Sequence, residues 1–108
     1  MSMDEVLFDR IADEELSTLE RVLLEIDPDE IDVELAMGVL TVTFADGGKL
    51  VVNSHRAAGQ IWMAAFRQAW HFSPHEEAGR WQWRTEKDEL RATLSRLLSD
   101  KLGHAVAV

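Results

Sequence analysis

Cysteine is absent from this chain of 108 residues, and its absence removes several kinds of chemistry. No disulfide can form, no thiolate can act as a nucleophile, and no zinc ion or iron–sulfur cluster can be held by cysteine ligands. The sequence also has no signal peptide and no apolar run of transmembrane length. We therefore expect a protein of the cytoplasm, where a lack of disulfides is usual.

Basic residues are scarce, because 11 Lys and Arg stand against 20 Asp and Glu and give a formal net charge of −9. Proteins that bind DNA or RNA place Lys and Arg on the phosphates, and anionic membranes attract basic segments. The composition therefore argues against nucleic acid and membrane partners. The sequence also lacks a glycine-rich phosphate loop and any recognisable nucleophile motif, so no catalytic residues are assigned.

Length and composition indicate a single folded domain over residues 1–108. Its hydrophobic fraction of 46% is normal for a globular protein. The acids, however, are concentrated near the start: residues 1–34 hold thirteen acids and two bases, whereas residues 35–108 hold seven acids and nine bases. A disordered acidic tail would lack apolar periodicity, which this segment has. We therefore expect carboxylates crowded on one solvated face of a folded domain.

Apolar residues in the first segment recur with the period of an α-helix. They are Phe8, Ile11, Ala12, Leu16, Leu19, Val22, Leu23 and Ile26. Asp4 and Glu5 favour the positive end of a helix dipole, and Pro28 interrupts the pattern. The sequence thus predicts a helix that begins near Asp4 and stops before Pro28.

The period then changes to two, as in strands with one buried face. The predicted strands cover residues 31–35, 39–44, 49–53 and 60–65, with shorter candidates at 70–72 and 81–83. Residues 45–48 carry a turn signal, and Ser73, Pro74 and Gly79 are expected in a loop between the last two strands.

A second helix is predicted near the C-terminus, where Leu90, Leu94, Leu97 and Leu98 share one side and Gly103 provides a stop. Each helix is apolar along one stripe only, so both should pack on the same face of the sheet. The predicted fold class is α+β: a two-layer α/β sandwich, with two helices on one face of an antiparallel sheet of five or six strands. The other sheet face should meet solvent.

The acidic face is the first candidate functional surface. Helix acids can join Asp27, Asp29 and Glu30 in the next loop, and Asp32 and Glu34 on the outward side of the first strand. Carboxylate oxygens suit hard cations such as iron, manganese, magnesium and calcium. The alternative is a solvated face that only keeps a small acidic protein soluble.

Trp62 is the second candidate. If Ile61 and Met63 face the core, alternation places Gln60 and Trp62 on the solvent face. A tryptophan there can anchor an interface and contribute ~2 kcal/mol or more when a partner buries it. Alternatively, the indole packs over neighbouring strands as a local lid. The residues alone leave both alternatives open.

The histidines give a weaker signal. His71 and His75, which are followed by two glutamates, have the composition of a metal site, but the proline between them argues against convergence of the imidazoles. His55 and His104 are expected to be isolated on the surface.

The order of these motifs resembles the frataxin family, and within it the bacterial CyaY type. The resemblance covers nearly the whole chain and is carried by residues 30–34, 38–44, 49–53, 60–64 and 69–72, with Trp81. It is interrupted at residues 54–59, where the family usually has a glutamine and a proline.

This resemblance implies weak, exchangeable binding of ferrous or ferric iron on the acidic surface, with no cysteine-ligated cluster. It also implies a part in iron–sulfur cluster assembly, through a cysteine desulfurase and its scaffold protein. The positions that match the family's iron ligands are Glu20, Glu25, Asp27, Asp29, Glu30, Asp32 and Glu34. The positions that match its exposed partner contacts are Asn53, Gln60 and Trp62.

Three functions are therefore considered. The leading one is an iron-binding regulator of the desulfurase or an iron donor, which is monomeric without metal. The second is an acidic protein-interaction module that works without metal. The third, a ferroxidase, ranks lowest because an open ridge of carboxylates lacks the buried di-iron site that such chemistry normally uses.

Overall fold

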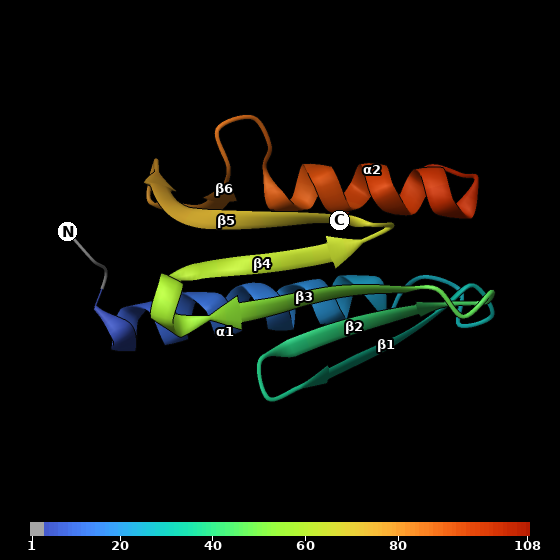
Figure 1. Ribbon diagram of the computed structural model, residues 1–108, viewed down its shortest axis with the longest axis horizontal. Coiled ribbons are helices and arrows are strands. Elements are labelled where there is room, and N and C mark those ends of the chain that lie inside the picture. The colour runs from blue at the N-terminus through green and yellow to red at the C-terminus, as the bar shows by residue number, and fades with distance from the viewer. Residues whose placement is uncertain (1–3) are drawn as a thin grey trace.

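The computed structural model describes residues 4–108, which form two helices and six strands (Figure 1). In chain order the elements are α1 (Glu5–Leu23), β1 (Ile31–Ala36), β2 (Val39–Phe44), β3 (Lys49–His55), the short 3-10 helix η1 (Arg56–Ala58), β4 (Gln60–Ala65), β5 (Gln68–Glu77), β6 (Arg80–Arg84) and α2 (Leu90–Leu102). The predicted α+β fold is confirmed. No helix within residues 4–108 has the length and apolar character needed to cross a membrane.

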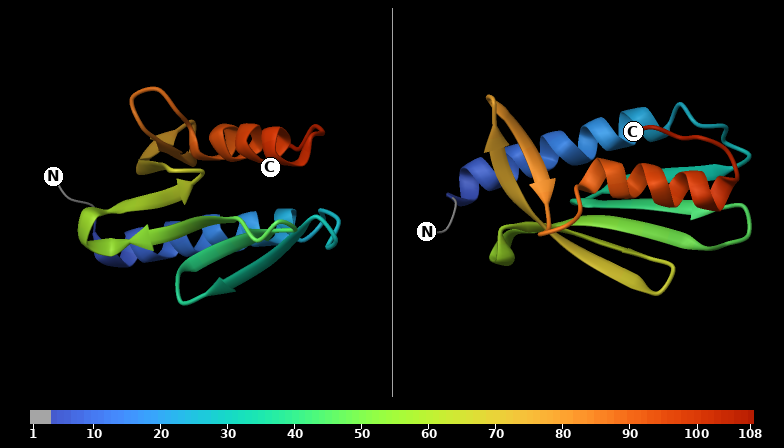
Figure 2. Two further views of the ribbon diagram at one scale, coloured as in Figure 1. Left: turned by 45° about the vertical axis from the view of Figure 1, so that its right-hand side comes forward. Right: turned by 90° about the horizontal axis from the view of Figure 1, so that it is seen from above.

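The six strands form one sheet in the order β1-β2-β3-β4-β5-β6, and all neighbouring strands are antiparallel. Both helices lie on one side of this sheet, as the view from above shows (Figure 2). Within the described chain no helix covers the other side, which is called the open face below. The two-layer arrangement predicted from the apolar stripes is therefore correct.

Alternation along the strands decides which side chains enter the core. Ile61 and Met63 of β4 are at most 1% exposed, whereas Trp62 between them is half-buried on the open face. Phe8 of α1 is buried against the face of the sheet that the helices cover. There its ring meets Trp83 of β6 edge-on at a centroid distance of 5.9 Å. The core thus lies between the helices and one face of the sheet.

Helix α1 begins where the sequence predicts. The side chain of Asp4 accepts a hydrogen bond from the Val6 N–H, and its backbone carbonyl accepts one from the Phe8 N–H. The helix ends at Leu23, and Ile26 packs against the core from the turn that follows. The apolar period thus continues past the end of the helix, because the turn still faces the core.

Three hairpins turn on two residues with positive φ, one of them at Ala78 and Gly79 between β5 and β6. In the other two, Met37 and Gly38 join β1 to β2, and Phe66 and Arg67 join β4 to β5; φ lies between 51° and 77° at all six residues. Positive φ at both central residues fits the right-handed twist of the flanking strands. At Gly38 an added Cβ would also lie 2.8 Å from the Ser54 hydroxyl, so any other residue would force that hydroxyl to move.

The predicted loop around Ser73 and Pro74 is wrong. β5 continues through both residues to Glu77, and Pro74 lies opposite Trp83 of β6. The first half of β5 pairs with β4 as far as Phe72, and the second half pairs with β6 only. One side of the strand is therefore free at Pro74, so a residue without an N–H is tolerated there.

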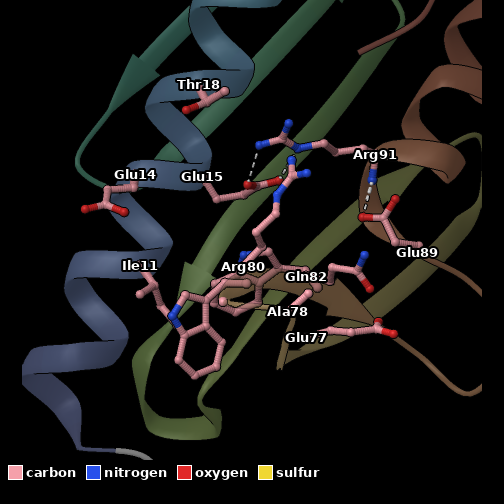
Figure 3. A pocket seen from close by; sticks show the side chains of 13 residues that line it. Ile11, Glu14, Glu15, Thr18, Glu77, Ala78, Arg80, Gln82, Glu89 and Arg91 are labelled. Carbon is pink, nitrogen blue, oxygen red and sulfur yellow. Dashed lines mark hydrogen bonds and ion pairs between the residues drawn. The ribbon is translucent and has the colours of Figure 1, made fainter.

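A buried ion pair joins the two helices beside a groove of about 670 Å³ (Figure 3). The side chain of Glu15 on α1 is 8% exposed, and its two oxygens accept hydrogen bonds of 2.8 and 2.9 Å from Arg91 on α2. This contact raises the pKa of Arg91 above its ordinary value. Glu89 caps α2 by accepting from the backbone N–H groups of Arg91 and Ala92.

The chain after α2 folds back along that helix. The hydroxyl of Ser99 both accepts from the Val106 N–H and donates to its carbonyl, and the Val108 N–H donates to the Ser95 hydroxyl. At the start of this tail, the imidazole Nε2 of His104 lies 2.8 and 3.0 Å from the two carboxylate oxygens of Glu30. The tail therefore contacts both α2 and the loop before β1.

Replacing Arg91 by Leu should lower the free energy of unfolding by about 1–3 kcal/mol, because the buried Glu15 carboxylate loses its partner. This expected loss of stability is smaller than that for a fully buried ion pair, because the Arg91 side chain is 39% exposed. Urea unfolding measures the change. As a control, Arg96→Leu on the exposed side of α2 should change stability by less than about 0.5 kcal/mol. Equal losses in both variants would contradict the role given to the pair.

The His104–Glu30 pair should make stability depend on pH. The hydrogen bond to Glu30 is the main cause that raises the pKa of His104 above 6.5. The stabilisation that the pair gives to the folded protein is therefore complete at pH values below 6.5, and it is lost as the pH rises through the raised pKa of His104. The difference in Tm between the wild type and His104→Gln should shrink from about pH 5.5 to about pH 9. His75→Gln, at an exposed position, is the control, and a difference that grows with pH would refute the assignment.

Candidate functional site

The acidic ridge comprises the seven carboxylates that were predicted as iron ligands. They are Glu20, Glu25, Asp27, Asp29, Glu30, Asp32 and Glu34. The structure distributes them over the end of α1, the loop of residues 24–30 and β1, which is the edge strand of the sheet. The short loop that leads from α1 into β1 connects these three segments (Figure 1).

Asp32 and Glu34 lie on the open face. Both are exposed, and they stand opposite Thr43 and Thr41 of β2. Ile31 alternates with them and is buried under the helices. The predicted outward direction of both carboxylates is therefore correct, and it follows from the burial of their neighbours.

The remaining acids divide between the helix flank and the loop. Glu20 is half-buried on α1, whereas Glu25, Asp27 and Glu30 line a shallow pocket of about 340 Å³ beside the C-terminal tail. One carboxylate oxygen of Asp27 accepts a 2.9 Å hydrogen bond from the Asp29 N–H, which fixes the turn. The ridge therefore has one part beside the tail and another on the open face.

The ridge has few internal counter-charges. Among residues 4–108, Glu30 is the only ridge member with a basic side chain within 4.0 Å, namely His104. The other ion pairs of the described chain use acids outside the ridge, such as Asp9 with Arg56 and Asp46 with Lys101. The arginines of the chain therefore do not neutralise the ridge.

The carboxylates do not form a ready metal cage. Within the described residues, no three His, Asp or Glu side chains are grouped closely enough to hold a metal ion. Oxygen donors of this kind suit iron and other hard cations, but each cation would take only one or two protein oxygens here and keep water as its other ligands.

Three aromatic rings are stacked on the open face. The indole of Trp62 on β4 lies between the imidazole of His55, at a centroid distance of 3.8 Å, and that of His71 on β5, at 4.2 Å. The ring planes are within 16° of parallel in both contacts. We call His55, Trp62 and His71 the ring stack. Of the two alternatives left open for Trp62, packing against neighbouring strands is present, and it does not exclude contact with a partner.

Polar contacts fix the indole of the ring stack. The Trp62 Nε1–H donates to the Gln60 side-chain oxygen at 2.9 Å, and the Gln60 amide nitrogen donates to the Ser73 hydroxyl at 3.1 Å. Asn53 lies opposite Trp62 in the register of β3 and β4. The three predicted partner-contact residues are thus brought together on one part of the open face.

The histidine predictions need correction. His55 and His104 are not isolated, because His55 stacks on Trp62 and His104 binds Glu30. His71 and His75 lie four residues apart on one strand, which separates their Cα atoms by about 13 Å, so they form no joint site. The sequence carried no signal for these contacts, because strand register and the path of the tail decide them.

Comparison with known proteins connects this geometry to a family. A model of the frataxin-like domain matches residues 1–104. The iron–sulfur cluster assembly protein CyaY of Dechloromonas aromatica is 38% identical over 112 residues, with 98% of this chain and 99% of the relative covered. The protein of the same name from Pseudomonas fluorescens is 34% identical over 103 residues, covering 95% and 93%.

Solved structures agree in fold. Frataxin from Psychromonas ingrahamii, at 23% identity, superposes with a TM-score of 0.81 and covers 97% of both chains. Trimeric frataxin from the yeast Saccharomyces cerevisiae, in a complex with ferrous iron, has a TM-score of 0.63 at 28% identity and covers 95% of this chain and 89% of its own. The family resemblance of the sequence motifs is confirmed, and the chain belongs to the frataxin family, in its bacterial CyaY type.

Proposed function

We propose that this protein binds iron and takes part in iron–sulfur cluster assembly, as a regulator of a cysteine desulfurase or as an iron donor. Its family membership supports a role in cluster assembly, since relatives such as the Dechloromonas protein carry that name. The yeast relative in complex with ferrous iron supports iron as the cation. Iron is here a cargo, delivered or sensed, and not a resident cofactor.

One observation carries the proposal: six of the seven ridge carboxylates have no basic side chain within ion-pair distance among residues 4–108. Carboxylates gathered in this way repel one another, at about 1 kcal/mol or less for each exposed pair at 4 Å. A bound cation relieves that repulsion, so it stabilises the folded protein by an amount that grows with the logarithm of the cation concentration above its Kd. The ridge is therefore a place where a cation lowers the free energy of the fold.

The expected binding is weak and exchangeable. Because each cation takes only one or two carboxylate oxygens and keeps several waters, little energy opposes its release. Such a site suits a protein that passes iron on or responds to its concentration. Asp32 and Glu34 are the best candidates, since both are exposed and point to the open face.

The partner proposed for the protein is a cysteine desulfurase with its scaffold, docked on the open face. An acidic ridge attracts a basic protein surface from a distance and accelerates the encounter, in a manner that weakens with salt. Asn53, Gln60 and Trp62 lie on the same face as Asp32 and Glu34 and would form the contact after the encounter.

A second candidate is a docking module that needs no metal. The lack of three converging ligands within the described chain favours it. In this case the ridge serves electrostatic attraction alone, and iron binds only incidentally. The two candidates differ in whether iron changes the affinity for the desulfurase.

The iron proposal predicts that Asp32→Asn with Glu34→Gln weakens ferrous iron binding by roughly tenfold, since two contributions of about 1 kcal/mol or less are removed. Anaerobic titration followed by backbone amide signals measures the change. The control is Asp100→Asn with Glu86→Gln, which removes the same charge at exposed positions outside the ridge. Equal affinities in the two double variants would contradict binding at the ridge.

The docking candidates are separated by measuring desulfurase affinity with and without ferrous iron. If iron is sensed or donated at the ridge, the wild type should bind with an affinity that changes with iron, and the Asp32→Asn with Glu34→Gln variant should lose this dependence. A loss of affinity in the variant that is the same at every iron concentration would favour the metal-free module.

A further inference from the structure

The ring stack is unusual because both faces of its tryptophan are already occupied. His55 and His71 cover the two sides of the indole, and Gln60 takes up its N–H. Trp62 therefore cannot offer a bare aromatic face to a partner. What reaches the surface is the edge of three stacked rings, two of which are imidazoles.

Strand register produces this arrangement. His71 on β5 stands directly opposite Trp62 on β4. His55 on β3 stands opposite Gln60 of β4, so His55 is a diagonal neighbour of Trp62. Side chains in these relations lie close enough to touch when they are aromatic. The rings thus come from the three adjacent strands β3, β4 and β5.

The ring stack shares its face with the acids of β1. β1 and β4 are separated by two strands, so Asp32 and Glu34 lie on the order of 15 Å from the stack, within one protein interface of ordinary size. A partner that covers both must place basic groups over the two carboxylates and a second contact over the rings. The charge on the rings then matters for that partner.

The charged groups around the ring stack are not placed to neutralise a positive charge on its imidazoles. Neither His55 nor His71 has a carboxylate within ion-pair distance in residues 4–108. Arg56, the next residue on the η1 side, is held by Asp9 of α1 through bonds of 2.6 and 3.0 Å.

On the β5 and β6 side, the titratable and charged groups near the stack are His75, Glu77 and Arg84. Glu77 and Arg84 pair with each other at 3.9 Å, and His75 lies beyond Ser73 on the same side of β5 as His71. On β3 the next charged residue of the open face is Lys49, at the far end of the strand. No acid of these elements is paired with the imidazoles, so a proton on them adds positive charge to this face.

We propose that proton uptake by His55 and His71 of the ring stack releases the basic partner that docks on the open face. The inference rests on the proposed docking of a basic partner and adds its regulation. Histidine changes charge within the physiological range of pH. Two added positive charges oppose a basic surface, because like charges brought together across an interface are unfavourable.

A hydrogen bond adds a second effect on the same side of the stack. The Nδ1 of His55 accepts from the Ala58 N–H at 3.2 Å, which requires that this nitrogen carries no proton. A doubly protonated His55 must give up this bond and loosen η1, which begins at the next residue. Proton uptake therefore alters both the charge and the shape of the surface beside Trp62.

The test measures binding of the cognate cysteine desulfurase to three proteins at about pH 8 and about pH 6. The wild type should lose at least about tenfold in affinity at the lower pH. A His55→Phe with His71→Phe variant, which keeps stacked rings but cannot take up protons, should lose much less. His75→Gln removes a histidine outside the stack and should behave as the wild type.

Comparison of the proteins at each pH cancels titration of the desulfurase itself. The indole N–H signal of Trp62 shows whether a variant keeps the stack, and His55→Gln with His71→Gln is used if the phenylalanine variant misfolds. Equal pH dependence in the wild type and the double variant would overturn the ring-stack inference while leaving docking intact. Absence of wild-type binding even at about pH 8 would instead refute the proposed docking, and the inference with it.

Discussion

Burial of only one face of the sheet is the constraint on which the rest of this structure depends. Successive side chains of a strand point to opposite faces of the sheet, and because both helices pack on the same side, only one of these two sets is buried under the helices. The burial of Ile31 directs Asp32 outward, and the burial of Ile61 and Met63 directs Trp62 outward. The burial of the core residues therefore sets the outward direction of the functional candidates on the open face, and contacts with Gln60, His55 and His71 then hold the Trp62 indole.

The same constraint divides the acidic ridge. The carboxylates of β1 belong to the open face, whereas Glu25 and Glu30 lie beside the C-terminal tail. Glu30 is paired with His104, so its negative charge is partly balanced within the protein itself. Asp32 and Glu34 have no basic side chain within ion-pair distance among residues 4–108, and they share the open face with the ring stack, so a single partner can contact both.

Much of the fold could be predicted because its signals are local. The helical period of α1, the alternation in β1 and β4 and the stop at Gly103 all follow from neighbouring residues. The continuation of β5 through Pro74 could not be predicted from neighbouring residues, because it depends on β5 changing its pairing partner from β4 to β6 halfway along. The outward direction of the candidate site residues was predictable, but the stack of His55 on Trp62 was not, since it depends on register between strands.

β1 is also an edge of the sheet, and this gives its carboxylates a further consequence. An edge strand exposes backbone N–H and C=O groups that can pair with another chain, and charged side chains hinder such pairing. Asp32 and Glu34 of two copies would be brought together if their edges met, and would repel. The two carboxylates therefore discourage pairing between two β1 edges, and a cation bound to them would remove this repulsion.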